Sequence, residues 1–219
     1  MRSFFNIRAI QLKNTTIKII NFMKTVEKLG LVKRDNLMSD GRPENDSDHI
    51  LKLCYLVMMV HPYLKKETDY IKMLEMALVH DLVEAKTGDF SLSEQAHNPQ
   101  LREMKKKKEM EAIEYYKAIL PSPINEKIYN IFIEYEQRKT TEAQIVWILD
   151  KLEANLQANQ YNGGDIRYWK DCPNGEMYYE YGITKKPLIS ELNEEILLEM
   201  EDMVITITKH NIEKMKSIS

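Results

Sequence analysis

The chain has 219 residues, 43% of them hydrophobic, and a formal net charge of -3 at pH 7. This length predicts a single domain over residues 1–219, and the small charge gives no reason to expect a nucleic-acid partner. No apolar run is long enough to cross a bilayer, so no membrane contact is expected. Two cysteines without disulfide or metal spacing, and the lack of a secretory signal in residues 1–11, indicate a cytoplasmic protein.

The composition predicts an all-α helical bundle, because Gly and Pro are few (7 each) while helix-forming residues are abundant. Residues 1–14 are expected as an N-terminal extension that can be flexible. Residues 31–44 read as a loop, since Asp40-Gly41 and Arg42-Pro43 break the periodicity. The expected helices are 14–30, 49–61 (capped by Asp46 or Ser47), 68–87, 101–120, 125–137, 142–160 and a C-terminal helix within 187–219.

The central predicted helix carries chemistry as well as core residues. Leu74, Leu78 and Leu82 recur at four-residue spacing, the mark of a helix with one buried face. His80 and Glu84 lie one turn apart, Asp81 adjoins His80, and Gly88 can end the helix before Asp89. For the His80-Asp81 pair alone, a core histidine beside a solvated carboxylate is the more common arrangement.

A four-ligand metal site can be assembled from three predicted helices. His49 starts one of them, His80 and Asp81 end the next, and Asp150 lies in the inward stripe of a later helix. A carboxylate in an apolar stripe is costly to bury unless it is paired or binds a cation. Considered alone, Asp150 could equally be partly exposed beside Lys151.

The basic run Lys105–Lys108 is better read as a solvated helix face than as an anion site.

Several blocks of the sequence resemble the HD-domain metal-dependent phosphohydrolases, and within them the 5'-deoxynucleotidase group. His49, His80-Asp81 and Asp150 match the H…HD…D pattern, which is shared by enzymes of many activities. The resemblance covers roughly Lys28 to Trp169 and implies an HD-domain helical bundle. The more specific blocks are Arg42–His49 and Leu78–Glu84 with Thr87–Asp89. Further matches are Ile133–Glu136, Trp147–Leu152 and Asn162–Gly164 with Trp169.

The resemblance implies a metal-dependent hydrolase that removes phosphate from (deoxy)nucleoside 5'-monophosphates. The family's metal ligands fall on His49, His80, Asp81 and Asp150, and its two acidic catalytic residues fall on Glu84 and Asp89. Arg34 matches an arginine that orients the phosphate, although Asp35 replaces the aromatic residue that follows it in some members. The implied substrate contacts are Arg34, Asp89, Phe90 and Ser91. The segment Phe90-Ser91-Leu92 differs from the segment containing threonine and proline that those members have at this place.

Two imidazoles and two carboxylates suit one divalent ion such as Mn, Co, Fe or Zn, and a second ion held by the same acids would be compatible with the sequence. Such a site could activate water, while a guanidinium held the phosphate. The alternatives are an HD hydrolase of a nucleoside triphosphate, cyclic dinucleotide or guanosine tetraphosphate, and a non-catalytic interaction module. A homodimer is a further expectation, from the resemblance and from the apolar residues Leu192, Ile196, Leu197, Met200 and Val204.

Overall fold

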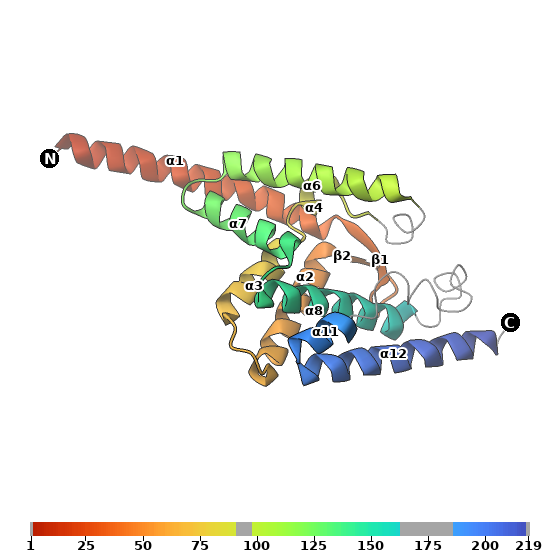
Figure 1. Ribbon diagram of the computed structural model, residues 1–219. Coiled ribbons are helices and arrows are strands. Elements are labelled where there is room, and N and C mark those ends of the chain that lie inside the picture. The colour runs from red at the N-terminus through yellow and green to blue at the C-terminus, as the bar shows by residue number, and fades with distance from the viewer. Residues whose placement is uncertain (1, 91–97, 163–185, 218–219) are drawn as a thin grey trace.

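The computed structural model describes residues 2–90, 98–162 and 186–217, and these are mostly helical, which confirms the predicted all-α class (Figure 1). Among them, no helix is long and apolar enough to span a bilayer. In chain order the elements are α1 (Arg2–Glu27), η1 (Lys28–Gly30), β1 (Lys33–Leu37), β2 (Pro43–Asn45), α2 (Asp46–Val60), η2 (His61–Tyr63), α3 (Tyr70–Val79), α4 (Glu84–Thr87), α6 (Pro99–Ile119), α7 (Ile124–Gln137), α8 (Thr141–Gln157), η3 (Ala158–Asn162), α11 (Lys186–Leu192) and α12 (Glu195–Lys216).

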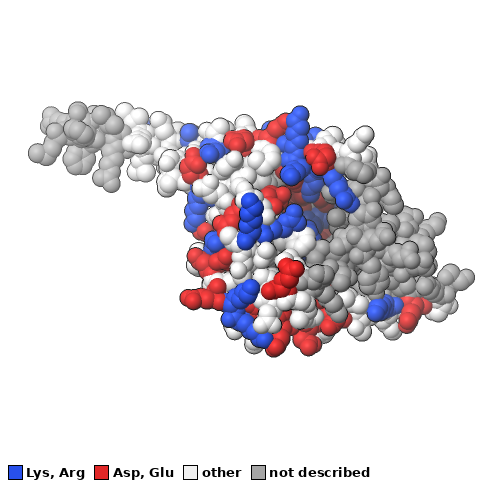
Figure 2. Space-filling view, in the orientation of Figure 1, with Lys and Arg blue, Asp and Glu red and all other residues white. Residues whose placement is uncertain are grey.

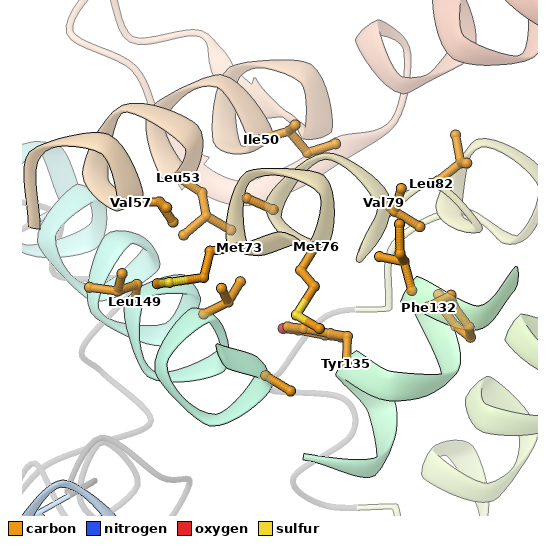
Figure 3. Packing of buried hydrophobic residues seen from close by; sticks show 14 of the residues in the cluster. Ile50, Leu53, Val57, Met73, Met76, Val79, Leu82, Phe132, Tyr135 and Leu149 are labelled. Carbon is orange, nitrogen blue, oxygen red and sulfur yellow. The ribbon is translucent and has the colours of Figure 1, made fainter. Parts of the chain in front are cut away.

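The hydrophobic core lies between α2, α3, α7 and α8 (Figure 3). Leu53 and Val57 of α2, Met73 and Met76 of α3, and Leu149 of α8 are all completely buried. Full burial of one such side chain contributes roughly 1.5–3 kcal/mol, so the contacts among these helices dominate the stability of the fold. Because α2, α3 and α8 also lead into the predicted ligands, the same packing fixes the site.

Helix α1 packs on α6, where the ring of Phe22 meets the ring of Tyr116 edge-on at 5.3 Å between centroids. Its N-terminal part projects beyond the rest of the molecule, and the described side chains at positions 9–12 are uncharged (Figures 1 and 2). The helix begins at Arg2, so residues 2–14, expected as an extension before a cap at Asn14, are helical. No Gly or Pro lies between Arg2 and Asn14, so nothing interrupts the helix there.

Residues 31–44 form a β-hairpin, not the featureless loop that the turn residues suggested. Strand β1 pairs antiparallel with β2, and Gly41 in the connecting turn has a positive φ of 82°. The strands are too short to show clear alternation in the sequence. Asn36 anchors β1 to α8 by donating a hydrogen bond to the carbonyl of Ala154 at 3.1 Å. The hairpin thereby carries Arg34 to the centre of the molecule.

Helix α2 begins one residue earlier than the predicted caps allow. Asn45 is the N-cap, and its side chain accepts a hydrogen bond from the Asp48 backbone N–H at 3.0 Å. The Asp48 carboxylate accepts the Asn45 backbone N–H in return at 3.2 Å, which completes a capping box. Asp46, expected as a cap, and His49 instead lie in the first turn with both side chains fully buried.

The central predicted helix, 68–87, is interrupted. Helix α3 ends at Val79, residues 80–83 form turns, and α4 runs from Glu84 until Gly88, which ends it at φ 73° as the sequence predicted. Five of the six residues 79–84 are buried. A straight helix buries one face, so burial on several sides requires the backbone to turn. His80 and Glu84 were expected on one face of a single helix, but they do not share a helix face.

The single C-terminal helix expected within 187–219 is two helices, α11 and α12. They are separated at Asn193, whose φ of 58° is the left-handed conformation common after a helix end. Leu192, Leu197 and Val204 are buried against the core. Thr140 caps α8, since its side chain accepts the Ala143 N–H at 3.3 Å. The Gly163-Gly164 and Trp169 motifs lie outside the described residues.

Candidate metal centre and its acidic neighbour

Two histidines and two aspartates from α2, the turn after α3, and α8 converge on one point. His49 Nε2 lies 3.2 Å from Asp150 Oδ1, 3.3 Å from His80 Nε2 and 3.7 Å from Asp81 Oδ2. His80 Nε2 lies 3.1 Å from Asp81 Oδ2 and 4.0 Å from Asp150 Oδ1. All four residues were predicted as metal ligands, and the fold brings them together.

The atoms of these residues that point away from the cluster have partners of their own. His49 Nδ1 pairs with Glu153, and His80 Nδ1 donates to the Ala77 carbonyl at 2.9 Å. The second oxygen of Asp150 accepts the Tyr135 hydroxyl at 2.7 Å and the Lys151 ammonium at 2.8 Å. These contacts leave the Nε2 atoms of both rings and one oxygen of Asp150 facing the cluster, as outer partners of metal ligands do.

The cluster fits a divalent cation. Four ligands around one tetrahedral ion at about 2.0 Å would lie about 3.3 Å apart, and the five contacts in the cluster that involve a histidine nitrogen span 3.1–4.0 Å. His49, His80 and Asp150 each offer a ligand atom within 4.8 Å of the other two, and Asp81 joins them through its contacts with the two histidines. The local electrostatics agree with the geometry. Burial and Arg34 both act to lower the pKa of His49, but hydrogen bonds to Asp150 and Glu153 outweigh them and raise it to about 9. The surroundings therefore favour a positive charge at this point.

A second acidic cluster adjoins the first and shares Asp81 with it. Oxygens of Asp46, Asp81 and Glu84 lie within 4.8 Å of one another. Asp46 is 0% exposed and Glu84 is 2% exposed. Burial, followed by the charge of Asp81, raises the pKa of Asp46 to about 7 and the pKa of Glu84 well above its usual range. Such crowded carboxylates can hold a proton near neutral pH.

Arg34, the predicted phosphate ligand, joins both clusters. Its Nη1 lies 3.2 Å from Asp81 and 3.5 Å from Asp46, and its Nε lies 3.3 Å from Glu44. Burial alone would lower the pKa of Arg34, but the surrounding carboxylates, Asp81 foremost, raise it, so the guanidinium stays charged. The arginine therefore brings a fixed positive charge to the edge of the metal cluster.

Lys105 of α6 brings a second cation, which corrects the reading of the basic run as a solvated face. Its Nζ lies 3.1 Å from Glu84 and 3.3 Å from Glu109, with 22% of the side chain exposed. Lys107 in the same run fits the expectation, being 79% exposed. The i, i+4 pairing of Lys105 with Glu109 was visible in the sequence. Its contact with Glu84, from another helix, was not.

Three further predicted residues lie beyond Gly88. Asp89 is close enough to Glu84 to contribute, after burial and Asp81, to the raised pKa of that carboxyl. The ring of Phe90 lies 5.3 Å from Lys108 Nζ. Ser91 is outside the described residues. Substrate contacts by these three residues remain predictions.

Four buried charged or polar residues around the site were missed by the sequence reasoning. Glu44, Asp46, Glu153 and Gln157 are each 5% exposed or less. Glu153 gave a usable signal, since it follows Asp150 by three positions on the same apolar stripe of α8. Glu44 and Asp46 gave none, because their burial depends on the hairpin folding over α2.

Comparisons with known proteins identify the family of this chain. The family described as "HD domain" matches residues 26–194. The 5'-deoxynucleotidase HDDC2 of Dictyostelium discoideum is 34% identical over 149 residues, covering 65% of this chain and 76% of that protein. The protein of the same name from Xenopus laevis is 30% identical over 145 residues, covering 65% of this chain and 69% of that protein.

Among solved structures, a protein from Magnetospirillum magnetotacticum titled a predicted metal-dependent phosphohydrolase matches with a TM-score of 0.68 at 21% identity. The match covers 91% of this chain and 94% of that one. At this identity the likeness shows the fold alone. The family match spans most of the chain and includes every residue of the His/Asp cluster. The chain therefore belongs to the HD domain family.

Proposed function

We propose that this protein is a metal-dependent phosphatase that removes the phosphate from deoxynucleoside 5'-monophosphates. One observation supports this most strongly: Arg34, a buried cation, lies between a His/Asp cluster that fits a divalent ion and carboxylates that can carry a proton. The Dictyostelium and Xenopus relatives, which are named 5'-deoxynucleotidases, support the substrate class. Hydrolysis of a phosphate monoester needs such charge compensation and proton transfer in one place.

His49, His80, Asp81 and Asp150 would hold the ion. Their nitrogen and oxygen donors, without a thiolate, suit Mn, Co, Fe or Zn better than Mg. When bound, such an ion acidifies water and polarises a phosphoryl oxygen. A second ion on the acidic cluster would be compatible with this proposal.

Arg34 would bind the phosphate. A guanidinium offers several N–H donors in one plane and can give two parallel hydrogen bonds to phosphate oxygens. The hairpin presents Arg34 next to Asp81, so a phosphate held there also lies next to the proposed metal ligands. The contacts of Arg34 with Glu44 and Asp46 fix the direction from which it approaches.

Glu84 would donate a proton to the leaving 5'-oxygen. Its raised pKa keeps the carboxyl protonated to higher pH than usual, which suits a general acid. Asp89, beyond Gly88, would orient the attacking water or the phosphate. Lys105, in contact with Glu84, would hold the Glu84 carboxyl in position.

A hydrolysis assay with deoxy- and ribonucleoside 5'-monophosphates tests this proposal. Nucleoside triphosphates, cyclic dinucleotides and guanosine tetraphosphate form the comparison panel, with release of phosphate, pyrophosphate and triphosphate measured separately. We expect phosphate release from deoxynucleoside monophosphates to have the highest kcat/KM. Preferred release of pyrophosphate or triphosphate would contradict the proposed substrate class.

Variants separate the proposed roles. Glu84→Ala and Asp89→Ala should keep the metal and lose about a hundred- to ten-thousandfold in kcat, the usual share of a general acid or base. Arg34→Ala should also raise KM, because a phosphate clamp contacts the ground state as well as the transition state. Glu75→Ala on α3 is a control, since Glu75 pairs at the surface with Lys127. Rates within twofold of the parent for the three site variants, with metal bound, would rule out these roles.

We also propose a homodimer, formed through α2. The C-terminal apolar residues considered for this role, such as Leu197 and Val204, pack into the core. In contrast, Leu51, Tyr55 and Met59 recur at four-residue spacing on α2 and are 58%, 53% and 56% exposed. Light scattering at micromolar concentration should give a dimer mass that Tyr55→Lys reduces to a monomer mass. A monomer mass for the parent would contradict the proposal.

A further inference from the structure

A buried ion network lies behind the candidate site, on the side of His49 that faces away from the metal cluster. Lys52 of α2 is its centre. The Lys52 ammonium lies 2.9 Å from Glu153 Oε1 and 2.6 Å from Gln157 Oε1, both on α8, and it also pairs with Glu44 of β2. Glu44 is 0% exposed and Glu153 is 5% exposed.

The two carboxylates of this network each reach a residue of the site. Glu153 uses its other oxygen to pair with His49 Nδ1. Glu44 uses its other oxygen to form an ion pair with Arg34 Nε at 3.3 Å, without hydrogen-bond geometry. A continuous series of contacts therefore runs from His49 through Glu153, Lys52 and Glu44 to Arg34. It joins a proposed metal ligand to the proposed phosphate ligand without passing through the metal cluster.

The arrangement is better explained by ion pairing than by a second metal site. Ligand atoms of Glu44, His49 and Glu153 do lie within 4.8 Å of one another. However, the Lys52 ammonium already contacts both carboxylates and supplies the positive charge that they require. A cation bound there would have to displace or approach the Lys52 ammonium, which like-charge repulsion opposes.

A histidine whose Nδ1–H donates to a carboxylate is fixed in one tautomer and one orientation, with the lone pair of Nε2 free for a metal. Such an outer carboxylate must itself be neutralised, because an unpaired charge in a buried position strongly destabilises the folded protein. Lys52 meets that need for Glu153 and for Glu44 at once. Removing its charge should therefore disturb both ends of the network together.

We propose that Glu153 and Glu44 are positioning residues coupled by Lys52. Glu153 holds the His49 ring with Nε2 towards the cluster, and Glu44 holds the Arg34 guanidinium beside Asp81. Lys52 thereby links the ordering of the metal-binding half of the site to that of the phosphate-binding half. The Arg34 part of this inference rests on the proposed function, whereas the His49 part requires only that the cluster binds a metal.

Titration of the full-length protein with Co²⁺, followed by visible absorption, tests the His49 part without any substrate. Glu153→Leu removes the acceptor and should weaken Co²⁺ binding by about 10–100-fold, the usual effect of losing an outer partner. Glu153→Gln keeps an acceptor oxygen and should retain most of the affinity. If Glu153→Leu does not fold, as judged by circular dichroism, Glu153→Ala takes its place. Parent-like Co²⁺ affinity in a folded Leu or Ala variant would overturn the proposal.

Lys52→Met tests the coupling. Besides weakening Co²⁺ binding, it should raise KM for deoxyadenosine 5'-monophosphate severalfold more than Glu153→Gln does, because Glu44 and Arg34 lose their anchor as well. Lys72→Met is the matched control: Lys72 also bridges two carboxylates, Glu134 at 2.8 Å and Glu142 at 3.3 Å, away from the site. Unchanged Co²⁺ affinity and KM in Lys52→Met would overturn the coupling.

The outcomes of these experiments distinguish a failure of this proposal from a failure of the proposed function. A parent protein that binds Co²⁺ but does not hydrolyse deoxynucleotides would contradict the substrate class, while the Glu153 variants would still decide the positioning role. A parent protein that binds no Co²⁺ would overturn both proposals.

Discussion

Asp81 and Glu84 are carboxylates three positions apart with opposite protonation behaviour. Burial acts to raise the pKa of Asp81, but His80 and Arg34 outweigh it and hold that pKa well below the usual range. Burial and the charge of Asp81 raise the pKa of Glu84. Two acids whose pKa values are driven apart suit different tasks, one as a permanent ligand and the other as a proton carrier.

Lys105 should tune the Glu84 carboxyl. The ammonium at 3.1 Å favours the ionised form of Glu84 and lowers its pKa, so Lys105→Met should raise that pKa further. If protonated Glu84 is the acid, the loss of kcat at high pH should then move to higher pH in this variant. A pH–rate profile measures the shift. Lys107→Met, on the exposed side of α6, is the control, and identical profiles for the two variants would exclude this role.

The proposed metal ligands could be predicted as a set, from the H…HD…D resemblance, although each residue taken alone was weak evidence. His80-Asp81 ends an apolar segment, and Asp150 interrupts an apolar stripe. The nearby cations Lys52 and Lys105, which contact other carboxylates, could not be predicted in the same way. A lysine in a charged helix looks solvated until the fold brings a carboxylate of another element beside it, as Glu84 is for Lys105.

At the level of elements, helices with a clear cap and one apolar face were predictable, and those shaped by long-range packing were not. Helix α8 begins at Thr141, one residue before the expected start at 142. The hairpin, the interruption at residues 80–83 and the reversal at Asn193 were missed, because each depends on contacts with distant segments or on a local backbone change that no periodicity shows. The missed hairpin and interruption carry Arg34, His80 and Asp81.

The Asn45 cap of α2 gives a prediction at this scale. Asn45→Ala removes the acceptor for the Asp48 N–H and should lower the free energy of unfolding by about 0.5–2 kcal/mol. Asn45→Gly should lower the free energy of unfolding by only a few tenths of a kcal/mol, since Gly is tolerated at a cap. Urea unfolding followed by circular dichroism measures both. Equal stability of the parent and the Ala variant would show that the capping box contributes nothing.

For the whole molecule, the metal centre joins segments that are distant in sequence. The contact between His49 and His80 spans 31 positions, and that between His49 and Glu153 spans 104. A ligand that binds only the folded chain at a hundred times its Kd adds about 2.7 kcal/mol of stability. For a chain of this size that corresponds to roughly 5–11 °C in Tm.

Scanning calorimetry with and without Co²⁺ should show this rise. Asp150→Ala removes a proposed ligand from the centre, so the variant should remain helical and show little or no rise. If Asp150→Ala gains as much Tm as the parent, the assigned ligand set is wrong.

The spread of these ligands along the chain also orders events during synthesis. Asp150 follows Asp81 by 69 positions, which a ribosome takes on the order of 3–14 s to add. Until α8 emerges, His49 and Lys52 lack the carboxylates of Asp150 and Glu153. A nascent chain therefore cannot complete the proposed ion site from its first half, and capture of an ion by all four residues would have to wait until α8 has packed on α2.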